Sequence, residues 1–384
     1  MEKVRFGIIG CGNMGSSHAK HLIEGKIENG ILTAICDINT KKFEIVKKLQ
    51  SEGISYYTDS EELFASGTCD VIMICTPHYS HPTLAVRAIE TGHHCIVEKP
   101  AGVYTLQVRE MLEKTKNSDK ILGIMFNQRT NPAFKKMRQM IKDGRIGEVK
   151  RTNWIITTWY RTQYYYDTGS WRATWAGEGG GVLYNQAPHQ LDLFQWIVGM
   201  MPTKVRAFCH FGKWHDIEVE DDVTCYCEYP NGATGVFITT TADAPGTNRF
   251  EVTGTKGTLF FEDDKLFYKE LKVDEREHCY AAKSGFAAPE ALPTVEVELE
   301  GENSQHVGIC NNIANAILGL EDVYAPASDG IHGVELANAM LLSTWINKDV
   351  TLPFDDGFFY EELKKRIAVS KPRATANDDV VASQ

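Results

Sequence analysis

The residues best suited to carry out chemistry in this sequence are Lys99 and His189. Lys99 follows Glu98 and the short apolar run His94–Val97, so a strand ending there would present the lysine at its carboxyl end. An ammonium group in that place can hydrogen-bond the oxygen of a reacting alcohol and stabilise its developing negative charge. His189 follows the glycines 179–181, which leave room for a ligand, and an imidazole can take a hydroxyl proton near neutral pH. The pair predicts removal of a proton from a hydroxyl group.

His189 lies in the stretch Val182–Val198, whose apolar pattern predicts a helix. Asn185 precedes the histidine by four residues and Asp192 follows it by three, so one helix would carry all three side chains on one face. On that face Asp192 is expected to orient the imidazole. Asn185 is expected to hydrogen-bond a hydroxyl group of the substrate.

The segment Gly10-Cys11-Gly12-Asn13-Met14-Gly15 follows the apolar run Val4–Ile9 and precedes a helical pattern. In this context the first glycine permits a tight turn, the second lets the backbone approach a pyrophosphate, and the third allows close helix packing. Asp37 comes 22 residues after the last glycine, at the end of the next apolar run. Its carboxylate would accept hydrogen bonds from the adenosine ribose and repel a 2′-phosphate, so the sequence predicts NAD rather than NADP as cofactor.

Aromatic and arginine side chains are concentrated in residues 151–184. Flat amphipathic rings stack on the C–H faces of a pyranose, while arginines bind its hydroxyl groups. The region therefore predicts a sugar-binding loop. The residues assigned to substrate binding are Tyr160, Arg161, Tyr164, Arg172 and Trp175, together with Lys99, Asn185 and His189.

Short apolar runs alternate with helical patterns over residues 1–126, as in βαβ units. Strands are predicted at Val4–Ile9, Leu32–Cys36, Val71–Cys75, His94–Val97 and Leu122–Phe126. Helices are predicted at Met14–Ile23, Thr40–Ser51, Leu84–Thr91 and Thr105–Lys116. These elements indicate a doubly wound parallel sheet with helices on both faces. Because ligands bind at the carboxyl ends of parallel strands, the glycine loop and Lys99 are expected at the same edge.

Residues 127–369 have a different pattern and are predicted to form an α+β domain. A helix is expected at Asn131–Asp143, and helical patterning returns at Gln305–Leu318 and Gly333–Asn347. Between them, strands joined by turns are predicted at Val149–Trp159, Thr203–Phe211, Asp222–Tyr229, Thr234–Thr241, Asn248–Gly254 and Gly257–Phe261. The polar residues 370–384 are predicted to be a flexible tail.

Composition excludes several classes of protein. The 384 residues carry 40 basic and 51 acidic side chains, a net charge of −11 without a basic run, which argues against nucleic acid as a partner. No apolar run approaches the roughly 20 residues that span a bilayer, and no export signal is evident, so a cytoplasmic location without membrane contact is expected. The ten scattered cysteines are expected to be reduced, and no metal site is predicted because no ligand set has the required spacing.

Taken together, these motifs resemble those of the Gfo/Idh/MocA family of oxidoreductases. The resemblance rests on the glycine loop with Asp37, on Thr76-Pro77 followed by His81, on Glu98-Lys99-Pro100, and on the glycine-rich approach to His189. It implies an N-terminal Rossmann domain and a C-terminal domain with a large open antiparallel sheet, whose face would hold a homodimer or homotetramer together. It also implies that Thr76, Pro77, His81, Glu98 and Lys99 bind the cofactor, that Lys99 is the catalytic lysine and that His189 is the acid/base. Asn185 departs from the family pattern, which often has aspartate there.

Three functions remain open on the sequence alone. The leading hypothesis is NAD-dependent oxidation of a secondary ring hydroxyl, at C3 in the most similar subgroup, of a pyranose, glycoside or cyclitol. A second is a glycoside hydrolase that oxidises C3 transiently, eliminates the anomeric substituent and then re-reduces the ring. A third is a sugar or dinucleotide sensor without catalysis.

Overall fold

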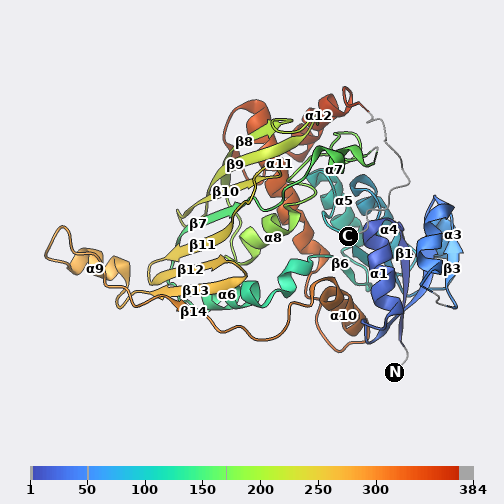
Figure 1. The fold of residues 1–384 in the computed structure, drawn as a ribbon, viewed down its shortest axis with the longest axis horizontal. Coiled ribbons are helices and arrows are strands. Elements are labelled where there is room, and N and C mark those ends of the chain that lie inside the picture. The colour runs from blue at the N-terminus through green and yellow to red at the C-terminus, as the bar shows by residue number, and fades with distance from the viewer. Residues whose placement is uncertain (1–2, 50–51, 170, 372–384) are drawn as a thin grey trace.

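The computed structural model describes the whole chain except residues 1–2, 50–51, 170 and 372–384. Two sheets, each with its own helices, form the two halves of the molecule (Figure 1). The predicted tail, residues 370–384, lies outside the described residues apart from its first two.

The N-terminal half is built on a parallel sheet of six strands in the order β3-β2-β1-β4-β5-β6. Its central strands read as nearly continuous apolar runs because helices cover both faces. The predicted doubly wound sheet is confirmed, while β3 and the helix after it were not anticipated. The strands are β1 (Val4–Ile9), β2 (Gly30–Cys36), β3 (Ser55–Tyr57), β4 (Val71–Ile74), β5 (His94–Val97) and β6 (Leu122–Ile124).

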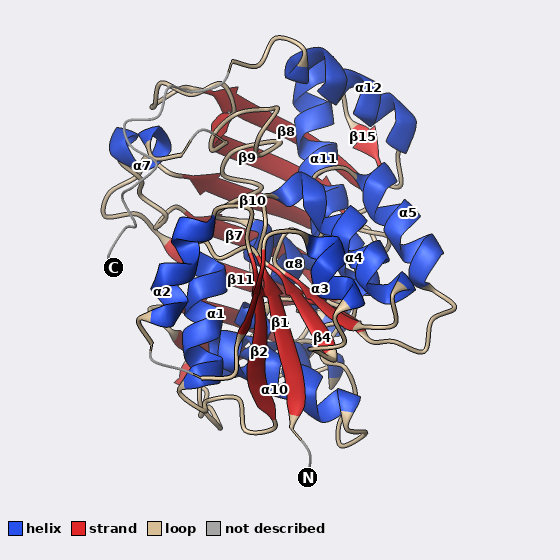
Figure 2. Ribbon diagram, turned by 90° about the vertical axis from the view of Figure 1, so that its right-hand side faces the viewer, coloured by secondary structure: helices blue, strands red, loops and turns tan. Residues whose placement is uncertain are grey.

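The helices of this half lie on opposite sides of the sheet: Figure 2 shows α1 and α2 on one side and α4 and α5 on the other. The prediction of one long helix over Thr40–Ser51 was wrong, because a 3₁₀ turn at Thr40–Lys42 precedes a short helix. The helices are α1 (Asn13–Ile23), α2 (Phe43–Lys47), α3 (Ser60–Ala65), α4 (His81–Glu90) and α5 (Thr105–Thr115).

The C-terminal half contains a nine-stranded sheet in the order β14-β13-β12-β11-β7-β10-β9-β8-β15. It is mixed, whereas an antiparallel sheet was predicted: β7 and β10 pair in parallel and all other neighbours are antiparallel. Strand β10 runs in the direction of β7, with which it pairs in parallel. Strand β9 is antiparallel to both β10 and β8, so β8 also runs in the direction of β7. The strands are β7 (Val149–Ile156), β8 (Lys204–Phe211), β9 (Glu220–Glu228), β10 (Thr234–Thr240), β11 (Asn248–Gly254), β12 (Gly257–Glu262), β13 (Lys265–Glu270), β14 (Val295–Glu296) and β15 (Val350–Thr351).

One face of this sheet is packed against helices and the other is open to solvent. Buried and exposed residues alternate along β7, and Trp154 on the buried face stacks on Phe250 with ring centroids 4.3 Å apart. On the open face Phe208 and Tyr226 are 52% and 41% exposed, an unusual place for aromatic rings. The helices are α6 (Pro132–Lys142), α7 (Gln163–Asp167), α8 (Pro188–Trp196), α9 (Glu275–Ala281), α10 (Gln305–Ile317), α11 (Gly330–Ile346) and α12 (Asp356–Ile367), of which α9 projects away from the body (Figure 1).

The end of the chain returns to the first core. Ile309 and Ile313 of α10, with Ile331 and Val334 of α11, belong to the same buried apolar cluster as the Rossmann strands. The rest of α11 packs in the core of the second half, so this helix contributes to both. Among the described residues, no helix is both long and apolar enough to cross a membrane.

Candidate active site at the carboxyl ends of the parallel strands

The glycine loop closes the turn between β1 and α1. Gly10 has φ +94°, and a Cβ there would lie 2.7 Å from the carbonyl oxygen of Cys75. A Cβ on Gly15 would lie 1.9 Å from the carbonyl oxygen of Gly10. Gly12, in contrast, faces open space and caps α1 without a side-chain hydrogen bond. The uncapped helix N-terminus beside this space fits a pyrophosphate, as the motif predicts.

Asp37 lies beside the loop, at the end of β2. Its Oδ2 accepts a hydrogen bond from the backbone N–H of Cys11 at 2.7 Å, and its Oδ1 accepts one from Asn39 at 2.8 Å. The Nζ of Lys42 lies 3.9 Å from the carboxylate. These contacts fix an anionic group next to the glycine loop, where a ribose with free hydroxyls fits better than one bearing a 2′-phosphate.

The turn after β4 contains Thr76, Pro77 and His81. The Thr76 hydroxyl hydrogen-bonds the hydroxyl of Ser80 at 2.7 Å. His81 is 1% exposed, and its two ring nitrogens lie 2.7 Å and 2.8 Å from the carbonyl oxygens of Thr76 and Pro100. His81 therefore joins the turns after β4 and β5 from within, so its contribution to a cofactor site is to hold the two turns in place.

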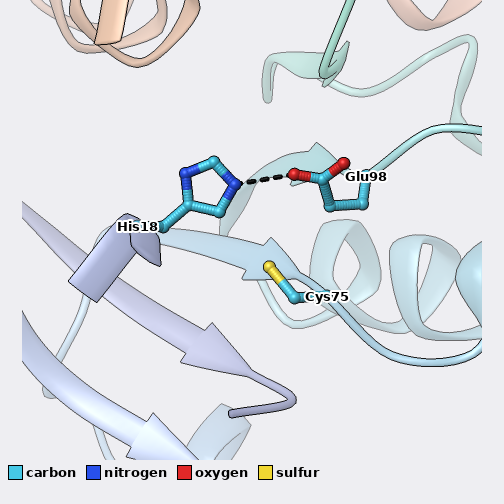
Figure 3. Close-up of side chains that lie close together, drawn as sticks. All are labelled: His18, Cys75 and Glu98. Atoms are coloured by element: carbon cyan, nitrogen blue, oxygen red, sulfur yellow. Dashed lines mark hydrogen bonds and ion pairs between the residues drawn. The ribbon is translucent and has the colours of Figure 1, made fainter. Parts of the chain in front are cut away.

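Glu98 was predicted to contact the cofactor, but its carboxylate is engaged inside the protein. Figure 3 shows its Oε1 facing the Nε2 of His18 on α1, at 2.6 Å. Burial opposes charge on His18, yet hydrogen bonds to Cys310 and Glu98 raise its pKa to about 10. Burial also opposes charge on Glu98, and His18 nevertheless lowers its pKa to about 2. A buried ion pair thus ties α1 to the end of β5, and the sequence analysis did not identify His18.

Cys75 completes a group whose potential metal-binding atoms lie within 4.8 Å of one another, the other members being His18 and Glu98 (Figure 3). The hydrogen bond between His18 and Glu98 uses the nitrogen and the oxygen that a metal ion would need. We therefore interpret the three groups as an ion pair between His18 and Glu98, with the Cys75 thiol beside it. The expectation that the chain binds no metal stays a prediction.

Lys99 reaches from the end of β5 toward the second half of the molecule. Its Nζ donates a hydrogen bond to the backbone carbonyl of Asn185 at 2.8 Å. Burial lowers the pKa of Lys99, and the nearby carboxylates of Glu98 and Glu178 oppose that effect. The contact places the ammonium group where the two halves of the molecule meet.

His189 is buried in the first turn of α8. Burial holds the pKa of His189 well below its usual value, and the charge of Lys99 lowers it further, so the imidazole is neutral near pH 7. Within the described part of the chain, no group hydrogen-bonds its buried Nδ1. The role predicted for Asp192 was wrong, because the Asp192 carboxylate accepts hydrogen bonds from the guanidinium of Arg129 at 2.6 and 2.7 Å. The buried Arg129 guanidinium requires that carboxylate, so Asp192 does not orient the imidazole.

The helix predicted from Val182 begins only at Pro188, so Asn185 and His189 do not share a helix face. The carboxylate of Glu220 on β9 accepts hydrogen bonds from the N–H groups of Gly181 and Leu183 at 2.8 and 3.1 Å. These bonds hold residues 181–183 against the sheet in place of the helical turn that was predicted there. Asn185 consequently lies in a tight turn, with its backbone carbonyl directed at the lysine.

Glu178 is a site residue that the sequence analysis missed. It is 2% exposed, accepts a short hydrogen bond from the side-chain amide of Asn185, and accepts another from the backbone N–H of Ala173 at 2.7 Å. Burial raises the pKa of Glu178. Its position immediately before Gly179-Gly180-Gly181, in the segment that leads to Asn185, was the signal available.

Tyr165 and Gln186 were also missed, and they complete a polar network with Asn185. The Tyr165 hydroxyl donates to Asn185 Oδ1 at 3.0 Å and accepts from Arg172 Nη1 at 2.5 Å. The Gln186 amide donates to Asn185 Oδ1 at 3.1 Å and to the Tyr165 hydroxyl at 3.2 Å, while its buried Oε1 has no partner among the described residues. Arg161 lies against the Tyr165 ring. An unsatisfied amide oxygen beside these groups suits a ligand that carries hydroxyl donors.

The three other aromatic residues assigned to the substrate have different positions. Trp175 is 5% exposed, and its ring packs against Phe211 and Trp345, so the prediction that it stacks on a sugar was wrong. The Trp175 indole is part of the hydrophobic core of the second half. Tyr160 and Tyr164 are 51% and 61% exposed, and their contact with substrate stays a prediction.

Comparison with known proteins agrees with this architecture. Residues 4–126 match the model "Oxidoreductase family, NAD-binding Rossmann fold", and residues 134–260 match the model of the "GFO/IDH/MocA C-terminal domain". Myo-inositol 2-dehydrogenase of Thermotoga maritima is 28% identical over 68% of this chain and 75% of its own length. The NAD⁺-dependent scyllo-inositol 2-dehydrogenase of Bacillus subtilis is 26% identical over 67% of this chain and 74% of its own.

Two solved structures show the same fold. The WlbA dehydrogenase of Chromobacterium violaceum, in complex with NADH and UDP-GlcNAcA, has a TM-score of 0.78 and 24% identity, with 92% of this chain and 97% of that one covered. Levoglucosan dehydrogenase, in complex with NADH and L-sorbose, has a TM-score of 0.76 and 20% identity, with 92% and 100% covered. The two family models together match well over half of the sequence. The chain belongs to the Gfo/Idh/MocA family of oxidoreductases.

Proposed function

We propose that this protein oxidises a secondary ring hydroxyl of a pyranose, glycoside or cyclitol with NAD⁺, at C3 of a pyranose. The observation that carries the proposal is the approach of two groups at the carboxyl edge of the parallel sheet: the Lys99 ammonium and the neutral His189 imidazole, close enough for the lysine charge to lower the histidine pKa. The ammonium group can stabilise a developing alkoxide, and the neutral imidazole can accept the proton that the hydroxyl group loses.

In the proposed reaction, NAD⁺ supplies the acceptor for the hydride that leaves the carbinol carbon. Lys99, fixed by the carbonyl of Asn185, donates a hydrogen bond to the reacting oxygen and stabilises its negative charge. His189 takes the hydroxyl proton, which its lowered pKa permits because the imidazole enters the reaction uncharged. The products are a ketone, NADH and one proton held on the imidazole.

Substrate class is inferred from the polar groups beside these two residues. Asn185 is held by Glu178 and Tyr165, so its amide has a fixed orientation, and the unpaired Oε1 of Gln186 calls for a donor. A ring with several hydroxyl groups provides such donors. The inositol dehydrogenases and the sugar dehydrogenases among the similar proteins support a cyclic polyol.

We also propose that the open face of the nine-stranded sheet joins two or four copies of the chain. Phe208, Tyr226 and Ile155 are exposed on that face, and their burial against a second copy would remove apolar surface from water. Analytical ultracentrifugation tests this proposal: a Phe208→Asp, Tyr226→Asp variant should sediment as a smaller species than the wild type, and unchanged sedimentation would contradict it.

The test of function is nicotinamide absorbance after mixing protein, NAD⁺ and a panel of free sugars, methyl and aryl glycosides, anhydrosugars and inositols. NADH formed with one class, and abolished in Lys99→Met, supports the dehydrogenase. Release of the aglycone from an aryl glycoside without net NADH supports the redox-assisted hydrolase instead. Tight NADH binding without turnover of any member indicates a sensor.

A further inference from the structure

We propose that the substrate carries an oxyanion, a carboxylate or a phosphate ester, close to the reacting ring, and that Arg161 and Arg172 bind it. This inference rests on the proposed function, because it assigns a charge to the substrate of the same site. The geometry points to it through three observations: the partners of the two arginines, their position, and the balance of charge around Lys99.

Neither arginine has an ion-pair partner among the described residues. The Nη1 of Arg161 donates to the backbone carbonyl of Tyr160 at 2.9 Å, and the Nη1 of Arg172 donates to the Tyr165 hydroxyl at 2.5 Å, so both bonds go to neutral acceptors. Elsewhere a buried guanidinium, that of Arg129, bridges the two carboxylates of Asp192 and Asp329. Both site arginines are only partly exposed, and each retains N–H donors in the planar arrangement that matches an oxyanion.

The two guanidiniums lie against one ring beside the reaction centre. The central carbons of Arg161 and Arg172 are 5.1 Å and 4.7 Å from the centre of the Tyr165 ring. The hydroxyl of that ring bonds the side chain of Asn185, whose carbonyl holds Lys99. These contacts join the arginines to Lys99 through two residues, so we assign the anion to a substituent of the same substrate.

Positive charge exceeds negative charge in this cluster. Lys99, Arg161 and Arg172 are its cations, and the pKa of Lys99 is lowered first by burial and then by both arginines. The carboxylates near Lys99 are Glu98 and Glu178: Glu98 is already paired with the His18 cation, and Glu178 is bound to Asn185 and Ala173. Bound NAD⁺ would bring a positive nicotinamide ring, while the two negative charges of its pyrophosphate are assigned to the glycine loop. A neutral sugar would leave this excess uncompensated, whereas an anionic substituent would offset it.

The concentration of cations contrasts with the charge of the whole chain, which is −11. Two arginines beside the reactive lysine create a local positive potential that attracts anions, although the net charge of the chain repels them. Binding of NAD does not account for them, because the pyrophosphate site at Gly12 is formed by backbone N–H groups. The arginines are therefore available to the substrate.

The experiment compares three substrates that differ at C6 alone: methyl glucoside, methyl glucuronide (the methyl glycoside of glucuronate) and methyl glucoside 6-phosphate. We expect kcat/KM for the better of the two anions to exceed that for the neutral glycoside about 10-fold or more, as hydrogen bonds to charged groups imply. Preference for the glucuronide identifies a carboxylate, and preference for the phosphate identifies a phosphate ester. Equal or better use of the neutral glycoside overturns the inference.

The Arg161→Met and Arg172→Met variants locate the anion. Each should reduce the ratio of anionic to neutral kcat/KM about 10-fold or more, a readout that general damage to the site does not move. Arg276→Met, on the projecting helix α9, is the matched control and should leave the ratio unchanged. A ratio that survives both site substitutions overturns the assignment.

Direct binding separates this inference from the proposed function. In calorimetry with NADH-loaded protein, glucuronate should bind about 10-fold more tightly than glucose, and the difference should vanish in Arg161→Met. No oxidation of any substrate, together with this selective binding, would contradict the proposed oxidation and support anion recognition. Oxidation of neutral sugars without selective binding would support the oxidation and overturn the inference.

Discussion

The two sides of the candidate active site are built in different ways. On the cofactor side, backbone groups at strand ends make the site: glycines turn the chain, and the uncapped N-terminus of α1 faces open space beside Gly12. On the substrate side, side chains from irregular segments make it, with Glu178 and Tyr165 holding Asn185 and the Asn185 carbonyl holding Lys99. A backbone site depends on a few residue types at fixed spacing, whereas a side-chain network depends on the tertiary fold that assembles it.

The largest effect is expected on the substrate side. His189→Ala should reduce kcat for hydroxyl oxidation about 10²- to 10⁴-fold, because the site loses the group that takes the proton. The Kd for NADH, measured by fluorescence titration, should stay near the wild-type value. A loss of NADH binding equal to the loss of turnover would show that the two sides are not separable.

The pH profile of the wild type sharpens this expectation. Because burial holds the pKa of His189 well below 6.5, the imidazole should still be neutral in mildly acidic solution. The acid limb of kcat should therefore lie below pH 6.5, and a limb centred at or above that value would contradict the assignment.

A stability effect of similar size is expected where α1 meets β5. Glu98→Gln should lower the free energy of unfolding by about 3–5 kcal/mol, because it leaves the His18 charge buried without a partner. Urea denaturation measures this loss. The double variant His18→Gln, Glu98→Gln should lose less than the sum of the single losses, and simple additivity would contradict the ion pair.

This pair also predicts how stability depends on pH. The Glu98 contribution should be present above its ordinary pKa of 4.5 and be lost as the pH falls toward about 2. The His18 contribution should be present below 6.5 and be lost as the pH rises through about 10. Glu98→Gln should flatten both limbs of the stability curve.

Two neighbouring glycines test the cofactor side at a smaller scale. Gly15→Ala should destabilise the protein by about 1–3 kcal/mol, because its Cβ would collide with the carbonyl of Gly10. Gly12→Ala should keep stability within about 0.5 kcal/mol, since its φ of −71° suits alanine and no atom lies within 4 Å of the new Cβ. The same Gly12→Ala methyl group should weaken NADH binding about 10-fold by entering the pyrophosphate space. Wild-type affinity in that variant would contradict the site.

A similarly modest effect, on turnover, is expected from Glu178→Gln. The amide can still bond Asn185, but the negative charge that supports the protonated form of Lys99 is lost. The pKa of Lys99 should therefore fall, and the alkaline limb of kcat should move to lower pH, with kcat reduced about 10-fold at pH 8. Glu178→Ala should lower kcat further by releasing Asn185. An unmoved alkaline limb in Glu178→Gln would exclude this role for the charge.

The contrast between a backbone site and a side-chain network also explains which features could be predicted from the sequence. The parallel sheet, the glycine loop and the place of Asp37 were predicted, because local periodicity and turn chemistry determine them. The sequence also predicted that Lys99 follows a strand of this sheet and that His189 lies in a helix, as the structure has them, and their roles stay predictions. It did not predict that Arg129 takes Asp192, or that Glu220 delays the start of α8, since those partners are 63 and 37 residues away from the groups they bind. Charge pairing across such distances leaves no local pattern.

The return of α10 and the first turn of α11 to the Rossmann core has a consequence for biosynthesis. Ile309, Ile313 and Ile331 belong to the buried apolar cluster of the Rossmann domain, and they leave the ribosome long after its strands. A nascent chain that has completed only its first domain therefore exposes the surface these isoleucines will bury, which makes it a substrate for chaperones. Translation must pass residue 334 before the dinucleotide fold closes, so premature termination before that point should yield aggregates rather than a free cofactor-binding domain.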